Sequence, residues 1–219
     1  MRHVVWDWNG TLLDDQHVVV EALNAVLDDA GLPEVDLATY QRLYTRPVRL
    51  LYERLFGREV APDEWQRIDD VYHAGYRAAL ARARLAPDAE QALDAVAADG
   101  WTQSLLSMYR HEELVPLVER LGIDDRFVRI DGLRGPGGGV KAPHLEAHLA
   151  RLLHVAGDDP SRVLVVGDAL DDAAAAAHVG VACILYDGGS HPRQELDRAG
   201  VPVADSLSHA LELARRTDP

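Results

Sequence analysis

From Pro87 onward, short apolar runs alternate with segments of helical periodicity, and this alternation limits the fold more than any other feature of the sequence. Strands that alternate with helices predict an α/β fold with a parallel sheet and helices on both of its faces. The run at residues 162–166, RVLVV, suits a parallel strand buried on both sides. The remaining predicted strands are residues 101–106, 127–130 and 181–185, and the predicted helices are 89–98, 111–121, 143–155, 171–178 and 207–215.

The N-terminus adds one more strand, and that strand ends at a carboxylate. Val4, Val5 and Trp6 form a short apolar run that stops at Asp7, and Asn9-Gly10 then predicts a turn. Open α/β sheets bind ligands just past the carboxyl ends of their strands. We therefore expect Asp7 to project into a ligand site at that edge.

Residues 15–84 show helical patterns and no convincing strand. The helical patterns cover residues 18–27, 37–43, 48–56 and 62–80. An all-helical segment between a first strand and a later α/β chain is typical of an inserted cap. We predict a core domain made of residues 1–14 and 85–219, and a helical cap domain of residues 15–84.

Charge and cysteine content exclude several functions. The net charge of −14 argues against binding to nucleic acid or anionic membranes, because these partners require basic surfaces. Cys183 is the single cysteine, so an intrachain disulfide or a cysteine zinc site is not expected. Asp7 interrupts the first apolar run too early for a signal peptide, and no stretch has transmembrane length. The sequence predicts a cytoplasmic protein, and it does not define an oligomeric state.

Four short motifs, in order along the chain, resemble those of the haloacid dehalogenase (HAD) superfamily. Residues 7–11, DWNGT, follow a strand and are similar to the first motif of the family, Asp-x-Asp-x-Thr. Ser107 after a strand and Lys141 just before a helix match the second and third motifs. Residues 167–172, GDALDD, resemble the fourth, an acidic pair placed after a strand. The resemblance covers essentially the whole chain and implies a Rossmann-like core with an inserted cap of the C1 type.

The resemblance also implies a function and a set of site residues. It implies a Mg²⁺-dependent phosphatase that acts on a small phosphorylated metabolite, similar to phosphoglycolate or sugar-phosphate phosphatases, with an aspartyl-phosphate intermediate. Phosphoryl transfer depends mainly on positioning and charge neutralisation, which these residue types provide. The implied roles are nucleophile for Asp7; metal ligands for Asp7, Asp168, Asp172 and the Asn9 carbonyl; phosphate contacts for Thr11, Ser107 and the amides near Trp8 and Met108; and charge neutralisation for Lys141.

Four further basic and glycine-rich features carry predictions. Lys141 is the only lysine among 22 basic residues, which favours a specific need for an ammonium group there. Arg46 and Arg49 in the predicted cap are candidates to bind an anionic part of the substrate, since arginine suits bidentate contacts. Residues 135–139, GPGGG, lack the Gly-Lys-Ser/Thr of a Walker loop and predict a flexible loop. His144 and His148, four residues apart, are expected on a solvated helix face.

The sequence departs from the family at Asn9, where a phosphatase has the Asp that protonates the leaving group and later activates water. Asn cannot exchange a proton in this way. Three explanations stay open: a slow phosphatase, another proton donor such as His17 or His111, or a weakened protein that binds a phosphorylated ligand or a protein partner. Two related chemistries are disfavoured, because phosphonatases of the family need a cap lysine and its dehalogenases lack the acidic pair.

Overall fold

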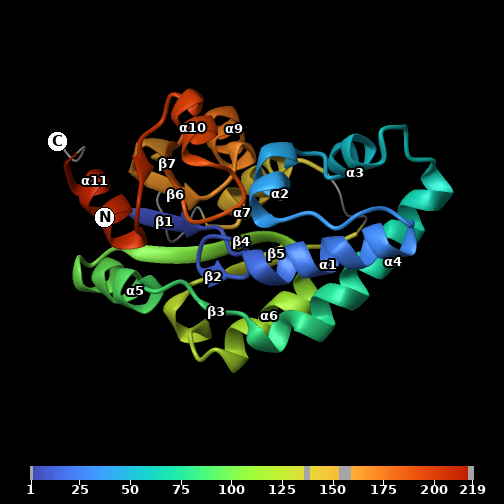
Figure 1. Cartoon of the computed structure of the whole chain (residues 1–219). Helices are drawn as coiled ribbons and strands as arrows, with labels where there is room; N and C mark the ends of the chain where they lie inside the picture. The colour runs from blue at the N-terminus through green and yellow to red at the C-terminus, as the bar shows by residue number, and fades with distance from the viewer. Residues whose placement is uncertain (1, 136–138, 153–158, 217–219) are drawn as a thin grey trace.

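The computed structural model describes residues 2–135, 139–152 and 159–216. Six parallel strands form one sheet in the order β5-β4-β1-β6-β7-β8, so the N-terminal strand lies at its centre (Figure 1). The strands are β1 (His3–Trp6), β4 (Thr102–Arg110), β5 (Ile130–Leu133), β6 (Val163–Gly167), β7 (Ala182–Tyr186) and β8 (Val203–Ala204). The predicted α/β fold with a parallel sheet is confirmed.

Helices cover both faces of this sheet, as the alternating pattern predicts. Val4 and Trp6 of β1 belong to one apolar cluster and Val5 to another, because successive side chains of a strand point to opposite faces. The first cluster includes residues of α5 (Ala89–Ala98), α6 (His111–Arg120) and α11 (Leu207–Arg216). The second includes residues of α7 (Ala142–Ala150), α9 (Leu170–Val179) and the short α10 (Arg193–Leu196).

Between the first strand and the rest of the sheet the chain is helical. This segment contains α1 (Gln16–Asp29), α2 (Leu37–Leu43), α3 (Arg49–Phe56) and α4 (Pro62–Ala79), and α1 packs along α4 (Figure 1). The chain enters and leaves the segment through β2 (Leu13–Asp14) and β3 (Arg84–Leu85), which pair antiparallel. The division of the chain into a core and a cap at these points stays a prediction. Within the described residues, no helix has both the length and the apolar character needed to cross a bilayer.

Two strands differ from their predicted bounds for local reasons. The predicted strand at 127–130 is found at Ile130–Leu133, and the pattern failed there because Asp131 and Gly132 are typical of loops. Gly132 is required within the strand, since a Cβ at this position would lie 2.7 Å from backbone atoms of Tyr109 and His111. Strand β4 continues past residue 106 to Arg110, with an irregular register between Leu106 and Arg110. Strands β2, β3 and β8 and helix α10 were not predicted, because they are only two to four residues long.

Two predicted segments extend beyond the described residues. Helix α7 confirms residues 143–150 of the helix predicted at 143–155, residues 151–152 form a turn, and residues 153–155 lie outside the described residues. Residues 136–138 of the glycine-rich segment also lie outside them.

A buried chain of hydrogen bonds links β1, β4 and α7. His148 Nδ1 lies 2.8 Å from Asp131 Oδ2, and its Nε2 lies 2.8 Å from Ser104 Oγ. Ser104 Oγ is also 2.8 Å from His3 Nε2, and His3 Nδ1 is 2.8 Å from Thr102 Oγ1. Burial lowers the pKa of both histidines, so both rings are neutral near pH 7. The acceptor-only carboxylate then fixes the direction of the chain, and each ring donates one hydrogen bond and accepts one. The expectation that His148 lies on a solvated face is wrong, since its side chain is fully buried.

This network predicts a loss of stability in acid. Burial, and secondarily His148, lowers the pKa of His3 to about 4, so the unfolded chain binds a proton there at higher pH than the folded chain does. The unfolded state is therefore favoured as the pH falls from about 6.5 to about 4, by up to about 3 kcal/mol. We expect the advantage of the wild type over His3→Gln in urea unfolding to shrink by about 2 kcal/mol between about pH 7.5 and about pH 5. A difference that does not change with pH would contradict the neutral state of His3.

Candidate active site

The carboxyl ends of β1 and β6 bring three carboxylates together. Asp7 follows β1 directly, and its backbone N–H donates to Val166 O of the neighbouring strand at 2.9 Å. Asp168 follows β6, and Asp172 lies in the first turn of α9. One carboxylate oxygen from each of the three lies within 4.8 Å of the other two. Parallel strands place their carboxyl ends on one edge, which is why residues far apart in the sequence meet here.

The turn after β1 requires a glycine. Gly10 has a φ of +73°, and a Cβ on it would lie 2.6 Å from Asp168 Oδ2 and 2.7 Å from Gln16 Nε2. Thr11 Oγ1 donates to Asp168 Oδ1 at 3.2 Å, and Ser190 N donates to Asp168 Oδ2 at 2.5 Å. Asp168 is thus held by hydrogen bonds from two different loops.

Lys141 is buried among these carboxylates. Its Nζ donates to Asp7 Oδ1 and to Asp172 Oδ1, each at 2.5 Å. Its backbone N–H donates to Asp171 Oδ2 at 2.9 Å, which fixes the start of α7 against the start of α9. The ammonium group predicted from the single lysine of the chain therefore lies beside Asp7 in the structure.

The cluster holds more negative than positive charge. Burial raises the pKa of Asp7 and of Asp168, and the neighbouring carboxylates raise both further. Lys141 opposes the shift at both residues, yet one ammonium cannot balance three buried carboxylates. An additional cation would relieve this excess, and carboxylate oxygens are the ligands that Mg²⁺ prefers. The donor set therefore fits a hard divalent cation.

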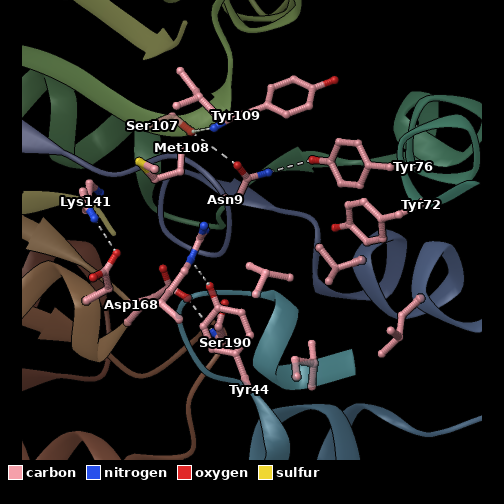
Figure 2. A pocket seen from close by; sticks show the side chains of 18 of the residues that line it. Asn9, Tyr44, Tyr72, Tyr76, Ser107, Met108, Tyr109, Lys141, Asp168 and Ser190 are labelled. Carbon is pink, nitrogen blue, oxygen red and sulfur yellow. Dashed lines mark hydrogen bonds between the residues drawn. The ribbon is translucent and has the colours of Figure 1, made fainter. Parts of the chain in front are cut away.

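Asn9 belongs to a second polar group, which it forms with Asp15 and Tyr76. Asn9 Nδ2 donates to Asp15 Oδ2 at 2.7 Å and to Tyr76 Oη at 2.8 Å, and Tyr76 Oη donates to Asp15 Oδ2 at 2.7 Å. Asn9 Oδ1 accepts a long bond of 3.4 Å from Ser107 Oγ. Both amide hydrogens of Asn9 are therefore directed to Asp15 and Tyr76 (Figure 2 shows the bond to Tyr76).

Asp15 is the carboxyl group in contact with Asn9. Burial raises the pKa of Asp15 to about 6, although hydrogen bonds from Tyr76, Asn9 and Gly10 oppose the shift. The two histidines suggested as proton donors lie elsewhere. His17 is exposed on α1, and His111 Nδ1 accepts from Gly132 N at 3.1 Å. Neither of them lines the cavity that contains Asp7.

A cavity of about 160 Å³ opens from this cluster toward the helical segment. The structure brings most of the site residues named from the sequence into its lining: Asp7, Asn9, Arg46, Ser107, Met108, Lys141, Asp168 and Asp172. Thr11 is not in the lining, because its hydroxyl is directed to Asp168. Arg49 also lies outside it and pairs with Glu53 at 3.0 Å on the surface. Substrate contacts of Thr11 and Arg49 stay predictions that this geometry does not support.

Sequence reasoning missed several polar residues of the site. Asp15 and Tyr76 surround Asn9, and Ser190 and Asp171 orient Asp168 and Lys141 through backbone bonds. The one available signal was the acidic pair Asp14-Asp15, which follows the first motif after two leucines. Tyr76 was indistinguishable from the apolar positions of a helix, and Ser190 acts through its backbone, which no side-chain pattern reveals.

The fold and the site define the class of this protein: a parallel α/β protein with an acidic, lysine-containing centre at the carboxyl edge of its sheet. The model of the haloacid dehalogenase-like hydrolase family matches residues 1–180. This chain belongs to that family and is an enzyme of the hydrolase class.

Individual relatives agree with this assignment. A phosphoglycolate phosphatase of Yersinia pestis is 30% identical over 188 residues, which are 84% of this chain and 80% of that protein. A phosphoglycolate phosphatase of Agrobacterium fabrum is 28% identical over 82% of this chain and 78% of that protein. The crystal structure of a predicted phosphatase from Clostridium acetobutylicum has a TM-score of 0.84 at 16% identity, and covers 97% of this chain and 98% of that one.

Removal of the buried ammonium tests the charge balance of the cluster. Lys141→Met leaves Asp7 and Asp172 buried without a counter-charge, and breaking a buried pair in this way typically costs about 3–5 kcal/mol. We expect this loss in urea unfolding at about pH 8 with EDTA present, and a smaller loss at about pH 5, where the carboxyl groups bind protons more readily. Arg162→Met, at an exposed residue outside the cavity, is the control. An equal loss at both pH values would show that Lys141 does not balance these carboxylates.

Proposed function

We propose that this chain is a magnesium-dependent phosphomonoester hydrolase that acts on a small phosphorylated metabolite through an aspartyl-phosphate at Asp7. The observation that carries the proposal is the placement of Asp7. Its Oδ1 accepts from Lys141, and its Oδ2 has no hydrogen-bond partner among the described residues. That oxygen is free to act as a nucleophile in a cavity whose other wall can hold the organic part of an ester. The relatives named phosphoglycolate phosphatase support a phosphatase.

The metal assignment rests on the same cluster. Asp7, Asp168 and Asp172 would hold Mg²⁺, together with the backbone carbonyl of Asn9. When bound, the ion supplies positive charge that offsets the negative charge of the phosphate and the carboxylates. Lys141 then serves as a fixed cation that keeps Asp7 ionised and oriented. Because Mg²⁺ and Lys141 would together neutralise the carboxylates, one ammonium group is enough in so acidic a site.

In the proposed reaction, Asp7 Oδ2 attacks phosphorus and the bond from phosphorus to the ester oxygen breaks. The ester oxygen leaves with the bonding electron pair. Water then attacks the phosphorus of the aspartyl-phosphate, and the bond to Asp7 breaks to release phosphate and restore the carboxylate. Ser107 and the backbone around Met108 line the cavity beside Asp7 and would hold the phosphate oxygens. Charge stabilisation by such preorganised groups is usually the largest contribution to catalysis.

The leaving oxygen lacks a proton donor at residue 9. Asn9 cannot transfer a proton, and its amide hydrogens already point to Asp15 and Tyr76. Wild-type enzyme is therefore expected to favour esters whose alcohol leaves easily as an anion. The alternative of a weakened protein that only binds a phosphorylated ligand gains no support from the relatives, which are named as phosphatases.

A metal-dependent turnover assay tests the proposal. We expect wild type to hydrolyse p-nitrophenyl phosphate with Mg²⁺ and to lose this activity with EDTA. Asp168→Asn removes the charge of one metal ligand, so it should lower the affinity of the enzyme for Mg²⁺. It should also reduce kcat by about 10²–10³, a range typical for the loss of one electrostatic group. Asp7→Asn is the inactive reference. No turnover by wild type, or unchanged Mg²⁺ affinity in Asp168→Asn, would refute the assignment.

Asp15, whose carboxyl group lies beside Asn9, determines what happens when residue 9 is changed to an acid. In Asn9→Asp alone, the new carboxyl lies next to Asp15, and two carboxyls at hydrogen-bond distance share one proton. In the double variant Asn9→Asp/Asp15→Asn, the carboxylate moves to residue 9 and the hydrogen bond is kept. We expect the double variant to gain more on alkyl phosphates than on aryl phosphates, by up to the roughly 10²–10⁴ that general acid catalysis supplies.

Steady-state kinetics of both variants on matched aryl and alkyl esters measure this gain. The single variant should gain less than the double variant, because repulsion by Asp15 raises the free energy of the ionised form. Equal aryl and alkyl gains in the double variant would mean that proton donation does not limit the wild-type reaction.

A further inference from the structure

The wall of the cavity opposite the carboxylates is aromatic. Tyr72 and Tyr76 extend from α4 toward Asn9, on the side away from Lys141 and Asp168 (Figure 2). Their rings are stacked, with centroids 6.0 Å apart and planes at 21°. Tyr52 contacts Trp65 edge-on, with centroids 5.9 Å apart, and both rings also line the cavity.

Aliphatic side chains complete this wall. Val19 and Leu23 of α1 line the cavity, as do Val48 and Leu51 at the start of α3. Rings packed among aromatic and aliphatic side chains gain both apolar burial and favourable ring–ring geometry. A volume of about 160 Å³ is close to that of the apolar protein cavity of about 150 Å³ that binds benzene. This volume includes the space beside Asp7 where the phosphate would bind, so the chemistry of the wall, and not the size of the cavity, decides which organic group fits.

The charged side chains that line the cavity either lie at the end near Asp7, where the phosphate would bind, or form ion pairs with one another. Asp69 is paired with Arg110 at 2.9 Å and with His73 at 3.4 Å. Burial raises the pKa of Tyr44 and of Tyr72, so both phenols stay neutral.

Arg46 is the cation left to consider. It donates to Tyr44 Oη at 3.1 Å, and its charge interacts with Asp171 and Asp7 at the catalytic edge. Its charge therefore acts on the side of the cavity where the phosphate would bind. An organic group that carries its own carboxylate would then face neutral side chains, namely the aromatic and aliphatic wall and the amide of Gln16. Burial of an unpaired charge there is costly.

We propose that the substrate is a phosphate monoester of an uncharged alcohol with an aromatic or alicyclic ring, and that the ring lies among Tyr72, Tyr76, Val48 and Leu51. The inference rests on the proposed function and specifies its substrate class. It separates this chain from an enzyme for 2-phosphoglycolate, whose organic part is a small carboxylate.

Matched primary alkyl esters test the proposal without a difference in leaving-group type. The panel is benzyl phosphate, cyclohexylmethyl phosphate, ethyl phosphate, 2-phosphoglycolate and glucose 6-phosphate, each with Mg²⁺. We expect kcat/KM for the two ring esters to exceed that for ethyl phosphate by at least about tenfold, because the ring adds several buried carbons. A higher kcat/KM for 2-phosphoglycolate or glucose 6-phosphate would overturn the substrate class and leave the phosphatase assignment intact. No turnover of any ester, p-nitrophenyl phosphate included, would overturn the phosphatase assignment itself.

Two bulky substitutions locate the ring. Val48→Trp fills the wall beside α3, and Leu50→Trp two residues away is the control, since Leu50 is exposed and outside the lining. We expect Val48→Trp to lower the ratio of kcat/KM for benzyl phosphate to that for ethyl phosphate by at least about fivefold, because the ring loses its apolar contacts. Leu50→Trp should leave the ratio unchanged. Thermal unfolding of both variants shows whether they fold, and a folded Val48→Trp with the wild-type ratio would overturn the proposed position.

Arg46→Gln separates the two possible uses of the remaining cation. If Arg46 acts on the phosphate, every ester of the panel should lose kcat/KM by a similar factor. A loss confined to 2-phosphoglycolate would show that Arg46 binds a substrate carboxylate, and the proposal would be overturned.

Discussion

The site depends on the balance between three buried carboxylates and one buried ammonium. Asp7, Asp168 and Asp172 are placed by neighbouring parallel strands and by the helix that follows, and Lys141 contacts two of them. Burial makes each carboxylate costly to ionise, so the cluster is stable only with compensating positive charge. The same imbalance suits the divalent cation proposed for this site. The burial of these carboxylates therefore both lowers the stability of the fold and serves the proposed function at this edge of the sheet.

A second polar group, made by Asn9, Asp15 and Tyr76, links the sheet edge to α4. A carboxylate is present in this group, at residue 15 and not at residue 9. Three mutual hydrogen bonds satisfy it, and burial holds its pKa near neutrality. A carboxylate at residue 9 as well would place two like charges in contact. The asparagine is therefore coupled to its surroundings, and its exchange for an acid has consequences beyond the loss or gain of one proton donor.

The sequence predicts the fold well because the fold depends on patterns that side chains reveal. The apolar runs of β1 and β6 and the residues that end them, Asp7 and Asp168, place the carboxylates correctly. Gly132 and His148 show where patterns fail. Gly132 is typical of loops but lies within a strand, because a side chain there would clash with neighbouring backbone. His148 is a polar residue of a helix but is buried, because Asp131 and Ser104 on two strands bind its ring. The aromatic wall was missed for a similar reason, since Tyr72 and Tyr76 have the spacing of core residues whether they face a core or a cavity.

The aromatic wall and the missing proton donor favour the same chemistry. A leaving alkoxide is a strong base and needs a proton, whereas a phenoxide is a weaker base and leaves more easily without one. An enzyme with Asn9 in place of an acid is therefore expected to lose least rate on esters of phenols. A ring-sized apolar cavity recognises the same part of such an ester that makes it a good leaving group. The two features thus act on the same part of the ester, its organic group: the wall through the shape of that group, and residue 9 through the basicity of the oxygen that leaves with it.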